Sequence, residues 1–141
     1  MPFTINCISL PVDNLKRSLR FYRECFALSI PEDDSPDQAA DHCPILLPGG
    51  LYLVLILRKE FSEFTTLAQT GTAAAGASEC ILSYFARTAD EVDAIAARCA
   101  RAGGTVASGA QTREWGYAAL LTDPDAHIWE VLHNENLTKG E

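Results

Sequence analysis

The sequence repeats one order of patterns, and this repeat constrains the fold more than any other feature. In each half, an alternating segment is followed by an amphipathic helical segment and then by short apolar runs. The apolar stripes of the two helices align at an offset of about 77 residues, with Leu15 opposite Val92 and Leu19 opposite Ala96. The repeat predicts two copies of one strand–helix–three-strand module whose sheets each need covering.

The first half predicts a strand, a helix and three further strands. Residues 3–12 alternate, and we expect one side of this strand to be buried, the side with Ile8, Leu10 and Val12. Asp13 or Asn14 offers an N-cap to a helix over residues 15–26. Short strands are expected to follow at residues 28–31, 43–48 and 51–58, the last two joined by a turn at Gly49-Gly50.

The second half predicts the same order of elements. Residues 79–86 are a strand candidate, and Thr88 can cap a helix over residues 89–102, with Glu91 completing a capping-box pattern. The pair Gly103-Gly104 ends this helix. Three apolar segments follow, at residues 105–108, 115–122 and 127–134, with a turn between the last two.

These patterns predict an α+β chain with one domain over residues 1–141. We place the first module at about residues 1–58, a linker at about 59–78 and the second module at about 79–137. The linker contains a small-residue stretch, TGTAAAGA, which is typical of a flexible connection. A short helix is expected before it, with the apolar side chains Phe61, Phe64 and Leu67.

Charge and composition exclude several partners. The chain has 11 basic and 19 acidic side chains and a net charge of −8, so it lacks the basic surface that nucleic acid requires. The longest apolar run, Leu51–Leu57, is too short to span a membrane, and the N-terminus does not resemble a secretory signal. Five cysteines without a CxxC pair predict reduced, mostly buried thiols in a cytoplasmic protein.

Two segments carry a resemblance to a known family. The helical segment VDNLKRSLRFYRECFAL (12–28) and the later segment DPDAHIWE (123–130) resemble signatures of the glyoxalase / bleomycin-resistance / extradiol-dioxygenase (vicinal oxygen chelate) superfamily. The resemblance implies paired βαβββ modules whose curved mixed sheets surround a cleft, with the helices outside. It also implies a homodimer, because domains of this family often pair with a second copy.

The resemblance further implies a divalent metal, Zn, Ni, Mn or Fe(II), held by two histidines and one or two carboxylates. The family's first-strand histidine falls on Cys7, and the other inner positions fall on or near Val54, Leu82 or Tyr84. The last-strand carboxylate matches at Glu130. We therefore expect no metal cofactor, and if a metal binds, Glu130 and Cys7 are its candidate ligands.

Alternation predicts which side chains line the cleft. If Glu130 faces it, Ile128 and Leu132 point the same way, while Trp129 and Val131 face the helices. The predicted ligand-binding residues are Cys7, Ser9, Tyr84, Trp115, Tyr117 and Glu130. Their mostly apolar, aromatic character suits a small aromatic or amphipathic molecule. Two other interpretations stay open: Trp115 and Tyr117 as core residues, and Glu130 as a structural carboxylate.

The leading hypothesis is a metal-free binding protein for such a small molecule, with Glu130 accepting a hydrogen bond or acting as a base. An enzyme is the alternative, either a lyase or isomerase of the glyoxalase class or a thiol transferase, with Glu130 as metal ligand or base. A third hypothesis is a partner module whose function lies in its dimer interface. The residues leave open whether any reaction is catalysed.

Overall fold

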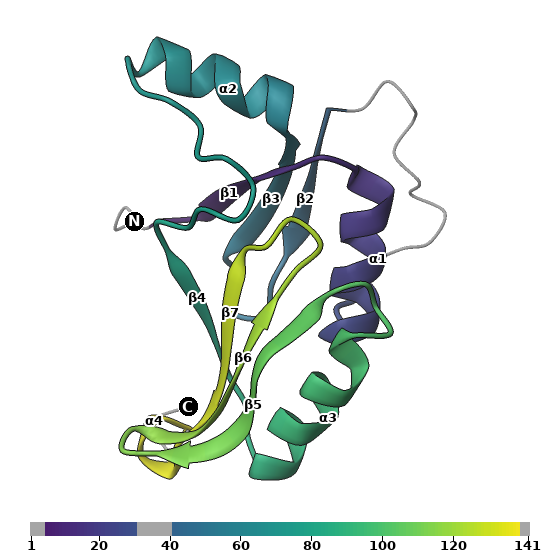
Figure 1. The fold of residues 1–141 in the computed structure, drawn as a ribbon, viewed down its shortest axis with the longest axis vertical. Helices are drawn as coiled ribbons and strands as arrows, with labels where there is room; N and C mark the ends of the chain where they lie inside the picture. The colour runs from purple at the N-terminus through teal and green to yellow at the C-terminus, as the bar shows by residue number, and fades with distance from the viewer. Residues whose placement is uncertain (1–4, 31–40, 139–141) are drawn as a thin grey trace. The chain divides into compact units, whose positions relative to one another are not determined.

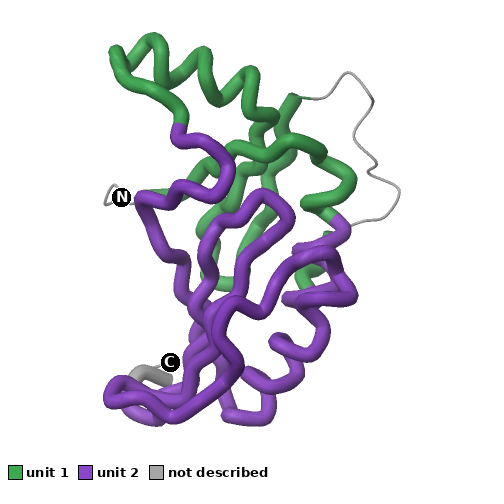
Figure 2. The backbone as a smooth tube through the Cα atoms, in the orientation of Figure 1, with its two compact units in different colours: residues 1–19, 28–72 green, residues 20–27, 73–141 purple. Residues whose placement is uncertain are grey.

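A computed structural model describes residues 5–30 and 41–138 of the protein, which form seven strands in two mixed sheets and four helices (Figure 1). This confirms the α+β class. The chain divides into two compact units, residues 1–19 with 28–72 and residues 20–27 with 73–141 (Figure 2). The predicted division into one domain with a linker stays a prediction.

Unit 1 contains a three-stranded sheet with one buried side. Its strands are β1 (Cys7–Val12), β2 (His42–Leu46) and β3 (Tyr52–Leu57), in the order β1-β3-β2. β1 is parallel to β3, and β2 is antiparallel to it. The alternation predicted for β1 is confirmed, because Leu10 and Val12 are buried while Cys7 is exposed.

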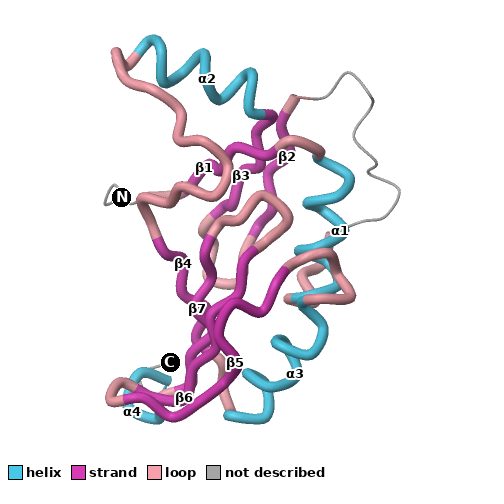
Figure 3. The backbone as a smooth tube through the Cα atoms, in the orientation of Figure 1, coloured by secondary structure: helices cyan, strands magenta, loops and turns pink. Residues whose placement is uncertain are grey.

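The expected glycine hairpin joins β2 to β3. Leu47 N–H donates to the carbonyl of Leu51 at 2.8 Å, and Gly49 and Gly50 both have positive φ, at 98° and 97°. Helix α2 (Arg58–Leu67) follows β3 directly, as the apolar spacing predicts, and it buries no residue. The segment from α2 to β4 contains no regular element (Figure 3).

Helix α1 (Leu15–Cys25) begins at a side-chain cap. The cap is Asn14, whose Oδ1 accepts from Arg17 N–H at 3.0 Å.

The strand predicted after this helix, at residues 28–31, is wrong over Leu28–Ile30. After the helix, Ala27 has a φ of 54°, and Ile30 N–H donates to the Leu28 carbonyl at 3.0 Å. This tight turn uses backbone groups that a strand would pair. Pro31 lies outside the described residues.

Unit 2 contains a four-stranded sheet with a helix on one face. Its elements are β4 (Ile81–Phe85), α3 (Ala89–Cys99), β5 (Thr105–Arg113), β6 (Gly116–Thr122) and β7 (Ile128–His133), followed by the short α4 (Glu135–Thr138). The order is β4-β7-β6-β5, with only β4 and β7 parallel. α3 packs on β5, β6 and β7 (Figure 1). The predicted cap is confirmed, because Glu91 N–H donates to Thr88 Oγ1 at 3.0 Å.

Register separates the side chains of this sheet into two faces. The helix face holds Tyr84, Tyr117, Ala119, Leu121, Trp129, Val131 and His133. The other face, called here the Glu130 face, holds Ile81, Ser83, Phe85, Ser108, Gln111, Arg113, Ala118, Leu120, Thr122, Ile128, Glu130 and Leu132. The orientation of β7 is as predicted, because Trp129 and Val131 are buried on the helix face.

An aromatic cluster fills the helix side of unit 2. Phe21, Tyr22 and Phe26 come from the end of α1 and the residue beyond it, and all three are buried. The Phe26 ring lies 4.8 Å from Trp129 and 5.4 Å from Tyr84, centroid to centroid. These residues belong to unit 2 because their contacts are made there.

The prediction that the five free cysteines are mostly buried is wrong. Cys25 and Cys99 are buried in unit 2, whereas Cys43 is half-buried and Cys7 and Cys80 are exposed. Cys7 lies on the side of β1 opposite to the buried Leu10 and Val12. Among the described residues the longest helices have 11 residues, and none is long and apolar enough to cross a bilayer.

Gly104 provides a test of the packing between α3 and the sheet. A Cβ at this position would lie 2.5 Å from the Thr122 carbonyl oxygen and 2.8 Å from Cys99 Sγ, and it would also meet the Phe21 ring. We expect Gly104→Ala to lower the free energy of unfolding by about 3 kcal/mol, measured by urea denaturation. Gly109→Ala, where a Cβ meets nothing within 4 Å, is the control. Equal stability of the two variants would contradict this packing.

Candidate ligand site on the Glu130 face

The carboxylate of Glu130 is held by two neutral donors. Its Oε2 accepts a hydrogen bond from Trp115 Nε1–H at 3.0 Å, and its Oε1 accepts a longer one from Ser83 Oγ at 3.4 Å. Ser83 is the β4 partner of Glu130 in the parallel ladder, which places both side chains on one face. The carboxylate therefore has a defined orientation, and it keeps lone pairs for a further donor.

Trp115 lies in the two-residue turn, Glu114-Trp115, that joins β5 to β6, and Gly116 begins β6 directly after it. Gly116 has a φ of 138°, and a Cβ there would lie 2.5 Å from the His133 carbonyl oxygen. This backbone interrupts the alternation of β6, so the indole lies over the Glu130 face. Asn134 Nδ2 donates to the Trp115 carbonyl at 2.8 Å and fixes the turn to the end of β7. The Trp115 side chain is 49% exposed.

A cation lies against the same indole. The guanidinium carbon of Arg113 is 5.6 Å from the Trp115 ring centroid, which is within the range of a cation–π contact. Arg113 Nη2 also donates to Ser108 Oγ at 3.1 Å. The indole therefore contacts a carboxylate through its N–H and a guanidinium through its ring.

Apolar side chains surround these polar groups. Ile81 and Phe85 flank Ser83 on β4 and are 60% and 49% exposed. Ile128 and Leu120 lie beside Glu130 on β7 and β6 and are half-buried. An aromatic ring, a carboxylate and exposed apolar groups on one sheet face form a surface suited to an amphipathic molecule.

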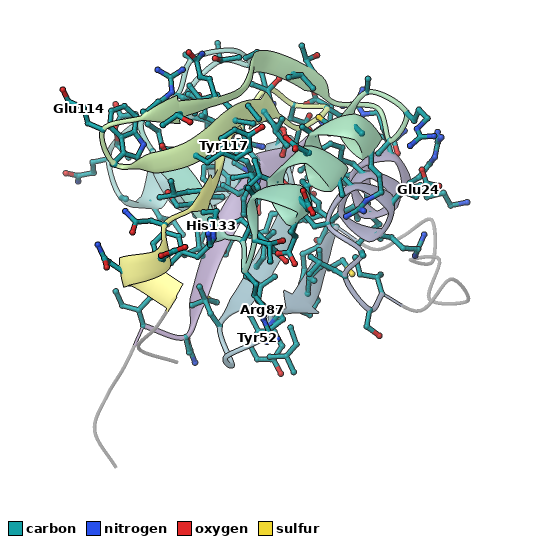
Figure 4. The ribbon with its side chains drawn as sticks, turned by 90° about the horizontal axis from the view of Figure 1, so that it is seen from below. Glu24, Tyr52, Arg87, Glu114, Tyr117 and His133 are labelled. Atoms are coloured by element: carbon teal, nitrogen blue, oxygen red, sulfur yellow. The ribbon has the colours of Figure 1, made fainter. Side chains whose placement is uncertain are left out.

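The structure brings together two of the six predicted ligand-binding residues, Trp115 and Glu130, and places two others on the opposite face. Tyr117 pairs with His133 on the helix face, and its hydroxyl donates to Asp93 Oδ1 of α3 at 2.6 Å (Figure 4). This hydrogen bond raises the pKa of Tyr117. Tyr84 packs against Phe26, and burial, together with the nearby Glu91, raises its pKa. Cys7 and Ser9 lie in unit 1, on the side of β1 opposite to Leu10 and Val12.

Ser83 and Arg113 were not predicted as site residues from the sequence. Ser83 follows from strand alternation once Tyr84 is placed on the helix face, since adjacent residues point to opposite faces. Arg113 gives no such local signal, because β5 changes register against β6 twice between Val106 and Gln111. These irregularities decide which β5 side chains share a face with Glu130.

The turn before β7 is organised by Asp123. Asp123 Oδ1 accepts from the backbone N–H groups of Asp125 and His127 at 3.0 and 2.9 Å, and Oδ2 lies 2.7 Å from His127 Nδ1. The hydroxyl of Tyr22 also donates to Oδ2, at 2.5 Å, and Trp129 Nε1–H donates to this hydroxyl at 3.1 Å. Burial, reinforced by the charge of Asp123, raises the pKa of Tyr22 well above its usual value.

Comparison with known families agrees with this arrangement of strands and helices. The profile of the Glyoxalase/Bleomycin resistance protein/Dioxygenase superfamily matches residues 4–131. The chain belongs to this superfamily. No curated protein matches the chain.

Several solved structures share the fold. A glyoxalase-related enzyme from Fulvimarina pelagi superposes with a TM-score of 0.76 at 23% identity, covering 93% of this chain and 88% of that one. A hypothetical protein from S. aureus gives 0.76 at 24% identity and covers 95% of both chains. A glyoxalase/bleomycin resistance protein/dioxygenase family enzyme from Burkholderia phytofirmans PsJN gives 0.72 at 19% identity, covering 92% and 97%.

The Glu130 face by itself does not supply the ligand set of the divalent metal that the superfamily implies. Among the residues assigned above to the Glu130 face, Glu130 is the only carboxylate, and the face holds neither histidine nor cysteine. One carboxylate is insufficient for a protein metal site. Within the described chain, one group of metal-ligand type forms, Asp123 with Asp125 and His127. The oxygens of Asp123 in this group already accept hydrogen bonds from its own turn and from Tyr22.

Replacing Tyr22 tests the Asp123 network. We expect Tyr22→Phe to lower the free energy of unfolding at pH 7 by about 1–3 kcal/mol, because Trp129 Nε1–H loses its acceptor and Asp123 loses a donor. The raised pKa of Tyr22 favours the protonated native state, so its stabilisation holds below about pH 10 and declines at higher pH. Between pH 9 and pH 11 the free energy of unfolding should therefore fall less in the variant than in the wild type. The slope of this free energy against pH should differ by an amount on the order of one proton.

Tyr52→Phe is the matched control, because Tyr52 is an exposed tyrosine on β3 whose hydroxyl makes no hydrogen bond within the described residues. Chemical denaturation at each pH measures both effects. If Tyr22→Phe and Tyr52→Phe show the same stability and the same alkaline slope, Tyr22 does not support the Asp123 turn.

Proposed function

We propose that this superfamily member binds a small aromatic or amphipathic molecule on the Glu130 face of unit 2, without the catalytic metal of its relatives. The observation that carries the proposal is the hydrogen bond from Trp115 to Glu130, made by an indole that is half exposed. A carboxylate fixed beside an exposed aromatic ring combines directional hydrogen bonding with an apolar contact surface.

Glu130 acts in this proposal as the polar anchor. An ionised carboxylate has about four lone-pair positions, and two of them are used by Trp115 and Ser83. The others accept a hydroxyl or an ammonium group of the ligand. The half-buried position of Glu130 strengthens such a bond relative to one made in bulk water. Trp115 and Phe85 supply the apolar surface that orients the ring of the ligand.

The alternative is an enzyme of the superfamily, either a metal-dependent lyase or isomerase or a thiol transferase. The first rests on Glu130, which occupies the position that the family resemblance assigns to a metal ligand. The second likewise uses Glu130, as metal ligand or base. The homodimer and the cytoplasmic location expected from the sequence stay predictions.

A ligand screen tests the binding proposal. We expect a panel of neutral, cationic and anionic aromatic compounds to include at least one that raises the melting temperature and changes the Trp fluorescence. Trp115→Ala should weaken binding of that compound by about tenfold or more, because removal of a stacking ring costs on the order of 1–3 kcal/mol. Phe64→Ala, which removes an exposed aromatic ring from α2 in unit 1, is the control.

Two outcomes of the screen would overturn the proposal. One is that no class of aromatic compound stabilises the protein. The other is that Trp115→Ala and Phe64→Ala bind the same compound with unchanged affinity, since the Glu130 face would then not be the binding surface.

Metal titration separates the proposal from the lyase alternative. We expect calorimetry with Mn²⁺, Ni²⁺ and Zn²⁺ to show no stoichiometric binding that depends on Glu130, because a single carboxylate does not form a specific site. Glu130→Gln is the test variant, and Glu114→Gln, an exposed change of the same kind, is the control. Binding of one equivalent that is lost only in Glu130→Gln would favour the metal enzyme.

A further inference from the structure

Two opposite charges contact one exposed indole, and neither charge is in an ion pair within the described residues. Glu130 accepts its hydrogen bonds from an indole and a hydroxyl, which are neutral, and Arg113 donates to the hydroxyl of Ser108. Charged groups at partly buried positions are stabilised by a counter-charge. Within the described residues, the Glu130 face therefore presents a carboxylate and a guanidinium that lack a counter-charge and both contact Trp115.

We infer that the ligand is an aromatic carboxylic acid that also carries a hydroxyl or ammonium group. Its carboxylate binds Arg113, its ring lies against Trp115, and its hydroxyl or ammonium group donates to Glu130. The inference rests on the proposed function and narrows its ligand class. It adds Arg113 as a residue that determines specificity.

Arg113 has the donors for such a carboxylate. A guanidinium offers five N–H groups in a planar fork, and within the described chain one of its nitrogens, Nη2, donates to a side chain, Ser108. The remaining N–H groups match the two oxygens of a carboxylate. Arg113 is half-buried, and its contact with the Trp115 ring limits the positions of the guanidinium. This fixed orientation lowers the entropy lost on binding.

Glu130 selects against a simple acid. A carboxylate beside it is repelled, whereas a hydroxyl or ammonium group supplies the donor that its free lone pairs accept. An acid without such a group leaves Glu130 unsatisfied, and an amine without an acid leaves Arg113 unsatisfied. A molecule with both groups satisfies the two charges and covers the exposed apolar side chains of β4, Ile81 and Phe85.

Calorimetry with four probes tests the inference. The probes are 3-(4-hydroxyphenyl)propionate and tyrosine, which carry both groups, 3-phenylpropionate, which has only the acid, and tyramine, which lacks the acid. We expect the first two to bind about tenfold or more tightly than the last two, because each charge-assisted hydrogen bond provides on the order of one decade in affinity.

Variants assign the groups. Arg113→Gln should reduce the affinity for the two doubly functional probes by about tenfold and leave tyramine unchanged, while Glu130→Gln should weaken tyramine and spare 3-phenylpropionate. Arg87→Gln removes an exposed arginine of unit 2 that makes no hydrogen bond within the described residues, and it is the matched control (Figure 4). Arg113→Lys keeps the charge without the planar fork and should give an intermediate affinity.

The results distinguish an error in the inferred ligand class from an error in the proposed binding face. If tyramine binds as tightly as the acids in a Trp115-dependent manner, and Arg113→Gln changes nothing, the ligand class is wrong while the proposed binding face stands. If none of the four probes binds, the inferred ligand class is also overturned, and the aromatic screen described above then decides the proposed function separately. A retained thermal transition in Arg113→Gln and Arg113→Lys shows that the losses come from the site.

Discussion

The buried carboxylate of Asp123 is the group on which unit 2 depends. It closes the turn before β7 by accepting from two backbone N–H groups, and it joins this turn to the end of α1 through Tyr22. A fully buried carboxylate is tolerated because its oxygens are bonded on every side. Since side chains alternate along β7, the position of the turn directs Trp129 to the helices and Glu130 to the other face.

The Glu130 face depends on a second constraint, Gly116, the first residue of β6 after the β5–β6 turn. The backbone at Gly116 in β6 lies close to the carbonyl of His133 in β7, and a side chain at position 116 would push these two strands apart. The close approach directs the indole of Trp115 over the sheet, where its N–H meets Glu130. A turn and a strand register thus place an acceptor, an aromatic ring and a guanidinium together, although the outermost two, Arg113 and Glu130, lie 17 positions apart in the sequence.

The elements that depend on local patterns could be predicted from the sequence. Alternation in β1 and β7, the Thr88 cap and the Gly49-Gly50 hairpin are determined by neighbours within a few residues, and each was confirmed. The division of Trp129 and Glu130 between two faces was also predictable, because the period of a strand is two.

The composition of the site was less predictable, because it depends on contacts between distant residues. Tyr117 was predicted beside Trp115, but Gly116 interrupts the alternation between them, and Tyr117 bonds to α3 instead. Arg113 reaches the site through irregular pairing of β5 with β6, which no sequence period encodes. The absent strand at Leu28–Ile30 has the same origin, since one backbone hydrogen bond selects a turn.

The hydrogen bond between Trp115 and Glu130 is the central claim, and nuclear magnetic resonance of the two indole N–H groups tests it most directly. The chain has two tryptophans, and Trp115→Phe assigns their signals. The account predicts that Glu130→Ala shifts the Trp115 signal toward that of a solvent-exposed indole and leaves the Trp129 signal, held by Tyr22, in place. A Trp115 signal that does not move in Glu130→Ala would contradict the account.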